Sequence, residues 1–327
     1  MLARHLQRMQ ECRVTRAAWC AAALSLATGC ASACAPPPPA APEEPDNRWT
    51  DLTLGFYHGC GIRGNGDIRC WSGAPIPVRD TGADAVMDAS LLGTFPGPFA
   101  SVALNHPYPY PGHPETVCGV LRAGGASCWG GFPFIADGVF SAFYPDGYGN
   151  GCGLLSEGGG RCVWYGQDRE LPMVTAMSMS EYHLALIDVA GGLTLEQETA
   201  DEGRVTLVVA GSWKAIEGDG NGAFCGLQVG GTLSCWDFWT RTTPPPVLLS
   251  APTGTYQQVC LTADDQACVL DPAGKATCWG ADAMEAPDET FTKLACGNES
   301  VCGLTDDGRI VCWGDCDNGE CEVPAYE

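Results

Sequence analysis

The chain has 327 residues and a formal net charge of −22, from 39 acidic residues against 17 lysines and arginines. A surface this acidic repels phosphate backbones, which excludes a nucleic-acid partner. The 20 cysteines, many of them regularly spaced, indicate export to an oxidising compartment in which disulfides persist.

Residues 1–29 resemble a secretory signal peptide, because a start with four arginines precedes an apolar stretch too short to span a membrane. The following run, Leu-Ala-Thr-Gly-Cys30, resembles a bacterial lipobox in which alanine replaces the usual leucine. This resemblance implies that Cys30 is the lipidated first residue of the mature protein. Ordinary cleavage after Ala33 or Ala35 is the alternative and would release a freely secreted protein.

Residues 30–48 are a proline-rich tether, and such segments are extended and semi-rigid. Residues 1–29 contain four Arg and one Glu, so the remaining chain has a net charge of −25. This charge favours solubility over a specific basic partner. We therefore expect a bacterial lipoprotein of the outer membrane or cell surface, attached to the membrane only through its N-terminal lipid, or alternatively a secreted form.

From residue 49 to about residue 324 the chain repeats one frame, in which two cysteines are ten positions apart with glycine at the sixth position. A seventh copy keeps its glycine, Gly191, but has Ala185 and Leu195 at the cysteine positions. Tryptophan directly follows the second cysteine in five copies, where packing within the fold is its expected role. The six pairs are Cys60 and Cys70, Cys118 and Cys128, Cys152 and Cys162, Cys225 and Cys235, Cys268 and Cys278, and Cys302 and Cys312.

The spacing of the frame is typical of a β-hairpin. In the last copy, Asp306-Asp307-Gly308 predicts a three-residue loop whose glycine is left-handed. Folding about this loop places Cys302 opposite Cys312, and opposed residues have Cβ atoms about 4.5–5.5 Å apart. A disulfide needs roughly 3.5–4.5 Å, so a small adjustment closes it. Zinc binding is the weaker alternative, because zinc ligands cluster as closely spaced cysteine pairs.

The segments between the frames predict further strands. Each hairpin follows an apolar or aromatic stretch that is typical of a strand, such as residues 99–104 and 291–295. The frames recur at steps of 33 to 58 residues, and most steps lie in the range of β-propeller blades. Because a lone hairpin is marginally stable, each one must bury its apolar face against neighbouring copies. The sequence thus predicts an all-β fold.

The string Cys-Gly-Leu-x-x-x-Gly-x-x-x-Cys-Trp-Gly, with Gly-Phe-Tyr-His58-Gly ahead of one copy, resembles the regulator of chromosome condensation repeat. More closely, it resembles the cysteine-stapled form of this repeat in secreted bacterial proteins. The resemblance covers about residues 49–324 and implies a seven-bladed β-propeller with disulfides inside its hairpins. The chromatin and nucleotide-exchange roles of the family's founding member are not expected here, because the chain is acidic and exported.

Four more cysteines lie in the predicted propeller. Cys316 and Cys321 flank an Asp-Asn-Gly-Glu turn, and we expect them to pair. Cys260 and Cys296 end equivalent inner strands of the last two repeats, so a bond between them would join these two repeats. Cys34 is then left unpaired or bonded to a partner.

No motif in the chain predicts catalysis, since it has no nucleophile elbow and no zinc-protease motif. His58 and His183 occupy the same repeat position, which favours a structural role. The segment 315–320 is rich in oxygen ligands but lacks the register of a calcium loop. We therefore expect no catalytic residue, no metal and no other cofactor.

The loops that lead from each inner strand to its hairpin differ most between copies, and in a propeller such loops lie on one face. An insertion at 105–116 interrupts the period and alternates prolines with tyrosines and histidines. Variable, tyrosine-rich loops on a rigid scaffold are typical of binding sites, although this insertion could merely cover a neighbouring blade. We expect a partner-binding face that contains Tyr57, His106, Tyr108, Tyr110, His113, Tyr144, Tyr148 and Tyr182.

Three functions are compatible with these features. The first is a monomeric, non-catalytic propeller that binds an unknown protein or glycan at the cell envelope. The second is an exported lyase or hydrolase, because one fold can host many functions. The third is a structural protein of the cell envelope. The sequence favours the first, because no Asp/Glu/His cluster recurs at equivalent repeat positions.

Overall fold

The computed structural model describes residues 48–72, 92–105, 115–130, 138–145, 151–164, 167–179, 183–199, 203–219, 222–237, 251–263, 266–280, 284–317 and 319–325. Within these ranges the chain forms 24 β-strands and no helix, so none of the described residues belongs to a membrane-spanning helix. The predicted signal peptide, Cys30, Cys34 and the tether up to residue 47 lie outside the described residues.

Seven antiparallel sheets follow one another along the chain, and each consists of three or four consecutive strands. In sheet order, the strands are β1 (Trp49–Leu54), β2 (Gly59–Arg63), β3 (Ile68–Trp71), β4 (Gly93–Phe95); β5 (Phe99–Leu104), β6 (Thr116–Leu121), β7 (Ala126–Gly130); β8 (Phe140–Pro145), β9 (Gly151–Leu155), β10 (Gly160–Trp164), β11 (Gln167–Leu171); β12 (Val174–Met179), β13 (His183–Asp188), β14 (Leu193–Thr199), β15 (Gly203–Val209); β16 (Trp213–Gly218), β17 (Ala223–Gln228), β18 (Leu233–Asp237); β19 (Gln258–Leu261), β20 (Gln266–Leu270), β21 (Ala276–Gly280); β22 (Phe291–Cys296), β23 (Ser300–Thr305) and β24 (Ile310–Gly314).

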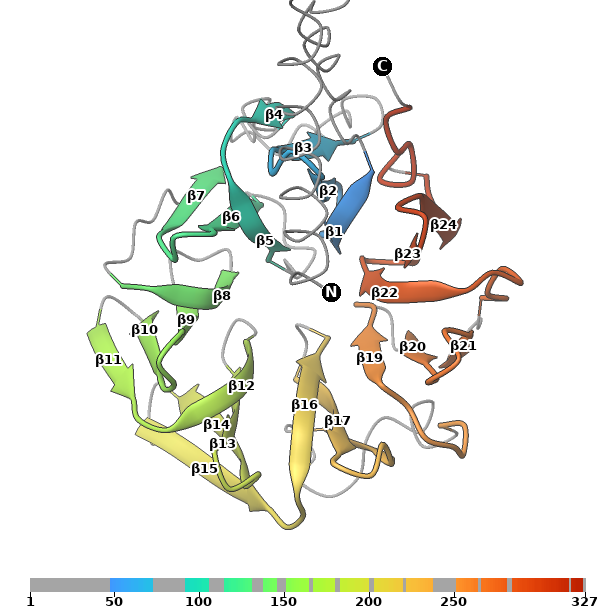
Figure 1. Ribbon diagram of the computed structural model, residues 1–327. Helices are drawn as coiled ribbons and strands as arrows, with labels where there is room; N and C mark the ends of the chain where they lie inside the picture. The colour runs from blue at the N-terminus through green and yellow to red at the C-terminus, as the bar shows by residue number, and fades with distance from the viewer. Residues whose placement is uncertain are drawn as a thin grey trace, which may run out of the picture. The chain divides into compact units, whose positions relative to one another are not determined.

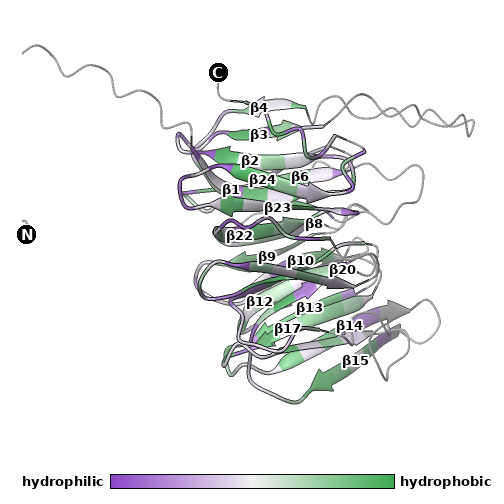
Figure 2. Ribbon diagram, turned by 90° about the vertical axis from the view of Figure 1, so that its right-hand side faces the viewer, coloured by the Kyte–Doolittle hydropathy of each residue, from purple (hydrophilic) through white to green (hydrophobic). Residues whose placement is uncertain are grey.

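The seven sheets are the blades of a propeller, which confirms the predicted fold class. Figure 1 shows the first strand of each blade nearest the common axis, namely β1, β5, β8, β12, β16, β19 and β22. Seen from the side in Figure 2, hydrophobic residues lie along the strands and hydrophilic residues are frequent in the connecting turns. The core is thus divided among the junctions between neighbouring blades.

One backbone hydrogen bond recurs between neighbouring blades. The carbonyl oxygen of a hairpin-turn glycine accepts a bond from the N–H group at the start of the next inner strand. Between the third and fourth blades, Gly159 instead donates to Val174 (3.0 Å). The six regular bonds are Phe99 to Gly66, Phe140 to Gly124, Trp213 to Gly191, Tyr256 to Gly231, Phe291 to Gly274 and Trp49 to Gly308. Because the last of these joins the first blade to the seventh, the ring is closed.

The hairpins have the register that the cysteine spacing predicts. In each of the six cysteine-bearing hairpins the two cysteines are direct cross-strand partners, and they form a disulfide with Cα atoms 4.0–4.1 Å apart. The predicted intra-hairpin disulfides are therefore confirmed. They join Cys60 to Cys70, Cys118 to Cys128, Cys152 to Cys162, Cys225 to Cys235, Cys268 to Cys278 and Cys302 to Cys312.

The turns and the seventh hairpin follow the same frame. All seven turn glycines have a positive φ, for example +82° at Gly308, so each one adopts the left-handed conformation that the loop requires. In the fourth blade Ala185 opposes Leu195, and both side chains are fully buried. Apolar packing thus takes the place of the disulfide in this blade.

The glycine after the first cysteine makes room for an aromatic ring. A Cβ atom on Gly61 would lie 2.6 Å from the indole of Trp49 and 3.0 Å from the carbonyl oxygen of Asp51. The Trp49 ring in turn packs against Trp71, the tryptophan after the second cysteine, with ring centroids 5.4 Å apart. Equivalent pairs are Phe99 with Trp129, Trp213 with Trp236 and Phe291 with Trp313. These tryptophans therefore pack within their blades, as the sequence suggested.

The C-terminal segment 315–325, which we name the C-terminal strap, joins the last blade to the first. The disulfide Cys316–Cys321 closes a short loop in it. Val323 packs on the apolar cluster that contains Trp49 and Trp71 of the first blade. Ring closure thus involves side chains beyond the last strand as well as the backbone bond to Gly308.

Candidate functional site: the axial cavity

A cavity of about 280 Å³ lies among the inner strands of all seven blades. The residue on each inner strand that opposes the first cysteine position of its hairpin lines this cavity, and we name these seven residues the cavity row. They are Thr53, Ala103, Tyr144, Ser178, Glu217, Cys260 and Ala295. Some of their neighbours in sequence, such as Leu104 and Met179, also contribute to the lining.

On one side of the ring, polar side chains near the axis bind other parts of the protein. Lys293 forms an ion pair with Asp51, which also accepts a hydrogen bond of 3.1 Å from the N–H of Val102. The hydroxyl of Thr53 accepts a bond of 3.1 Å from the N–H of Leu104. These contacts link the seventh, first and second blades.

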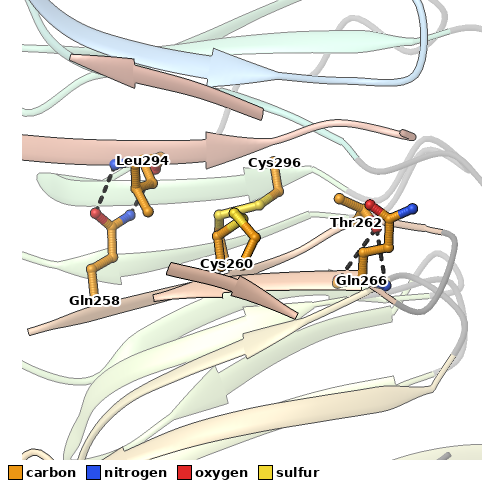
Figure 3. Close-up of a disulfide and its surroundings, with 8 residues drawn as sticks. Gln258, Cys260, Thr262, Gln266, Leu294 and Cys296 are labelled. Carbon is orange, nitrogen blue, oxygen red and sulfur yellow. Dashed lines mark hydrogen bonds between the residues drawn. A yellow bond between two sulfur atoms is a disulfide. The ribbon is translucent and has the colours of Figure 1, made fainter. Parts of the chain in front are cut away.

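The sixth and seventh blades are joined in the same region, as Figure 3 shows. The amide of Gln258 both donates to the carbonyl oxygen of Leu294 (2.7 Å) and accepts from its N–H (2.8 Å). The disulfide Cys260–Cys296 lies beside this pair and covalently connects the two inner strands. This bond and the one between Cys316 and Cys321 are the two additional pairings that the sequence suggested.

On the opposite side of the ring, the residues of the cavity row are polar, but their side chains do not bind other described parts of the protein. Tyr144, Ser178 and Glu217 come from three consecutive blades, the third to the fifth. Within the described part of the chain, none of these three side chains makes a hydrogen bond or an ion pair. Two residues earlier, the same strands carry Ala142, Ala176 and Ala215, which offer no polar partner. We name the three polar residues the open wall of the cavity.

Burial raises the pKa values of two residues of the open wall, Glu217 and Tyr144. It raises the pKa of Glu217 to about 7, while the positive charge of Lys293 acts in the opposite direction. Burial also raises the pKa of the Tyr144 hydroxyl, and the negative charge of Glu217 adds to this effect. Near neutral pH the tyrosine is therefore protonated, and the carboxyl group of Glu217 is poised between its two forms.

The two histidines at the common repeat position are structural. Nδ1 of His58 contacts a carboxylate oxygen of Glu115, and both residues are buried. The other oxygen of Glu115 accepts hydrogen bonds from the backbone N–H groups of Phe56 and Tyr57. This contact fixes the loop between β1 and β2 against the second blade. Burial lowers the pKa of His183 to about 4, so this side chain is neutral at physiological pH.

Two of the eight residues predicted to bind a partner can be located. Tyr57 lies in the loop between β1 and β2, is half-buried, and packs edge-on against Phe56 with ring centroids 4.4 Å apart. Tyr144 was expected in a loop, but it belongs to β8 and lines the axial cavity. The remaining six lie outside the described residues, namely His106, Tyr108, Tyr110, His113, Tyr148 and Tyr182.

The ends of the insertion at 105–116 are fixed to each other. The side-chain oxygen of Asn105 accepts a hydrogen bond of 2.6 Å from the N–H of Thr116. The N–H of Asn105 donates to the carbonyl oxygen of Thr116 (3.3 Å), and Asn105 itself is buried. The insertion therefore starts and ends at a rigid base on the second blade.

One group of possible metal ligands occurs among the described residues. The sulfur atoms of Cys302, Cys312 and Cys321 lie within 4.8 Å of one another. All three are in disulfides, and metals bind the thiolate form of cysteine. This group is therefore a contact between two disulfides.

Sequence reasoning missed Glu217 and Lys293 as residues of a common cavity. The signal was present in the repeat, because both lie on inner strands close to the position opposite the first cysteine. Aligning the inner strands on that position would have shown Glu217 where the other copies have Thr, Ala, Tyr, Ser or Cys, and Lys293 two residues before this position in the last copy.

Comparisons with known proteins support the repeat and the fold. Residues 291–320, which contain β22 to β24, match the family model for the "Regulator of chromosome condensation (RCC1) repeat". A search of curated protein sequences gives no significant match.

Several solved structures share the fold at low identity. The ectodomain of the receptor kinase ACR4 from Arabidopsis thaliana has a TM-score of 0.56 at 18% identity, over 82% of this chain and 97% of that one. Human WBSCR16 has a TM-score of 0.54 at 10% identity, over 78% and 86% of the two chains. Prp20p from Saccharomyces cerevisiae has a TM-score of 0.52 at 13% identity, over 76% and 80%. At such identities the similarity extends to the fold alone.

Proposed function

We propose that this protein, which contains RCC1-type repeats, is a non-catalytic binding scaffold. It is exported from a bacterial cell and anchored to the cell surface by a lipid on Cys30. Eight disulfides among the described residues indicate an oxidising environment. The lipobox-like run before Cys30 and the proline-rich tether support the anchor.

The observation that carries the binding role is the contrast between a uniform ring and non-uniform loops. Backbone bonds and disulfides repeat around the ring, whereas the loops between inner strand and hairpin differ in length and composition. The ends of the insertion at 105–116 are fixed to each other by the hydrogen bond between Asn105 and Thr116. Loops held on a rigid scaffold are where binding residues concentrate. The partner is a protein or a glycan, and its contacts are centred on this insertion.

A non-catalytic role is favoured by the chemistry of the cavity. Glu217 has a raised pKa, which is also a property of general acids and bases. Acid–base or nucleophilic catalysis also needs a second group placed to act on the same substrate atom. The only Lys among the cavity-lining residues is Lys293, and it is paired with Asp51. This pairing leaves the hydroxyls of Tyr144 and Ser178 beside Glu217 on the cavity wall, and burial raises the pKa of the Tyr144 hydroxyl, which makes it a weaker acid.

The binding role is tested by deleting Pro107–Pro114 together with a Tyr148→Ala substitution in the full-length protein. Cross-linking on intact cells, followed by mass spectrometry, compares the neighbours of the variant with those of the wild type. We expect the wild-type neighbour to be lost while disulfides and melting temperature are retained. A Val208→Ser variant on the exposed outer strand β15 is the control and should keep the neighbour. Retention of the neighbour after the loop deletion would refute the proposed face.

The anchor is tested separately by metabolic labelling with a palmitate analogue. We expect label on the wild type and none on a Cys30→Ala variant. An unlabelled wild-type protein that starts at Cys34 or Pro36 would show that the protein is freely secreted.

A further inference from the structure

The geometry points to the axial cavity as a binding site for a positively charged nitrogen group, an alkylammonium or a guanidinium, with Glu217 as its counter-ion. This inference concerns the cavity itself and does not depend on the proposed partner or on the loop face.

The charges near the axis do not balance. The charged residues of the inner strands that face the axis are Asp51, Glu217 and Lys293, and Tyr144 is the other titratable group there. Asp51 and Lys293 neutralise each other in an ion pair. Glu217 is therefore left as a net negative charge in a confined space, where a cation gains more from pairing than it would in water.

The open wall also carries hydrogen-bond acceptors that a cation could use. The hydroxyl oxygens of Tyr144 and Ser178 lie on the same wall as Glu217, one blade apart from each other. An ammonium or guanidinium group has several N–H donors and no acceptor, so it requires a set of oxygens. The open wall supplies two hydroxyl oxygens and a carboxylate, none of them used by the described residues. The face of the Tyr144 ring offers a further favourable contact for a cation.

The volume of the cavity limits the size of the group that it can hold. A cavity of about 280 Å³ is at the lower limit for pockets that hold small molecules. It suits a side-chain-sized group better than a nucleotide or an oligosaccharide. Its lining also includes Leu104, Met179 and the Cys260–Cys296 disulfide, which would contact the alkyl part of an amine.

The charged group could belong to a free small amine or to a Lys or Arg side chain of a partner protein. Pro145, Met179 and Gly218 line the cavity and end their inner strands, so the cavity reaches the ends from which the loops to the second strands depart. A protruding side chain would enter from that direction.

Isothermal titration calorimetry on the full-length protein at pH 8 tests the inference. The probes are butylamine, butylguanidine, the capped peptide acetyl-Gly-Gly-Lys-Gly-Gly-amide and uncharged 1-butanol. We expect the cationic probes to bind and 1-butanol not to bind. Glu217→Gln should weaken cation binding at least about tenfold, since a hydrogen-bonded charged contact is lost. Tyr144→Phe should weaken it several-fold, and the matched control Glu157→Gln, in an exposed turn, should leave it unchanged.

The two sources give different results. Tighter binding of the peptide than of butylamine indicates a partner's side chain, and the reverse order indicates a free amine. Circular dichroism and the melting temperature establish that the variants are folded. The inference is overturned if no cationic probe binds, if 1-butanol binds as well as butylamine, or if folded Glu217→Gln binds as tightly as the wild type. Deleting the insertion at 105–116 should not alter butylamine binding, so this test and the test of the loop face fail independently.

Discussion

The indole N–H of Trp71 donates a hydrogen bond of 2.8 Å to the carbonyl oxygen of Glu320. Trp71 ends β3 in the first blade, whereas Glu320 lies in the C-terminal strap, and both residues are almost fully buried. Every blade is built from consecutive strands, so no strand is exchanged between the two ends of the ring. The bond between Trp71 and Glu320 therefore adds to the contacts that hold the chain ends together, among them the backbone bond from Trp49 to Gly308.

Replacing Trp71 by Phe should destabilise the ring, because the carbonyl of Glu320 loses its donor. We expect a loss of about 1–3 kcal/mol in the free energy of unfolding, measured with guanidinium chloride under non-reducing conditions. Trp279→Phe is the matched control, because this tryptophan is similarly buried and its indole nitrogen has no hydrogen-bond partner among the described residues. Equal losses in the two variants would show that the bond to Glu320 contributes nothing.

The fourth blade should accept a disulfide at the position where the other six blades have one. Ala185 and Leu195 are direct cross-strand partners, as the cysteines are in the other blades. The double variant Ala185→Cys with Leu195→Cys should form one additional disulfide and be about 2–3 kcal/mol more stable than the two single variants predict together. Intact mass with and without reduction detects the bond, and thermal unfolding measures its effect. Two free thiols in the oxidised double variant would contradict the register of this hairpin.

A methyl group on Gly61 should strain the first blade. Its Cβ would meet the Trp49 ring and a backbone oxygen that has little freedom to move. We expect Gly61→Ala to lower the free energy of unfolding by about 1–3 kcal/mol through overpacking. Gly230→Ala is the control, because a Cβ atom there meets nothing within 4 Å. Unfolding of both variants at the same denaturant concentration would show that the first blade accommodates a methyl group on Gly61 without strain.

The ring could be predicted from the sequence because its determinants are local and repeated. The spacing of Cys302, Gly308 and Cys312 fixes one hairpin by turn chemistry and register, and five further copies repeat this spacing while a sixth keeps only the glycine. The cavity could not be predicted in the same way. Its open wall joins Tyr144, Ser178 and Glu217, which are 34 and 39 residues apart in sequence. They meet only because ring closure brings equivalent positions to one axis.

The position of Tyr144 could likewise not be predicted from the sequence. In the sequence this tyrosine marks the start of a tyrosine-containing loop, and one residue of register decides whether it lies in the loop or faces the axis. Its cross-strand partner Cys152 places it in β8. The bond between Cys260 and Cys296 was easier to anticipate, because both cysteines lie at or next to the ends of inner strands of successive repeats.

Stability should depend on pH through Glu217. Its pKa in the folded protein, about 7, lies above the ordinary value of 4.5 because burial favours the neutral form. The associated stabilisation is fully present below pH 4.5 and is lost as the pH rises towards 7. The Glu217→Gln variant has no carboxyl group that can ionise at this position, so its stability does not fall in this way as the pH rises. Relative to the wild type, the variant should therefore gain about 1–3 kcal/mol in the free energy of unfolding between pH 4.5 and pH 8.

Chemical denaturation at several pH values measures this difference. Glu157→Gln, in an exposed turn, should show no such trend. A difference between Glu217→Gln and the wild type that stays constant with pH would mean that the Glu217 carboxyl is not shielded from solvent in the cavity.

The stapled, closed ring is tested most directly by mapping the disulfides of the native protein, with digestion at acidic pH without reduction followed by mass spectrometry. We expect six bonds within hairpins, between cysteines ten positions apart, together with Cys260–Cys296 and Cys316–Cys321. A bond from a hairpin cysteine to a cysteine of another hairpin would contradict the register on which the blades, the cavity row and the axial cavity all depend.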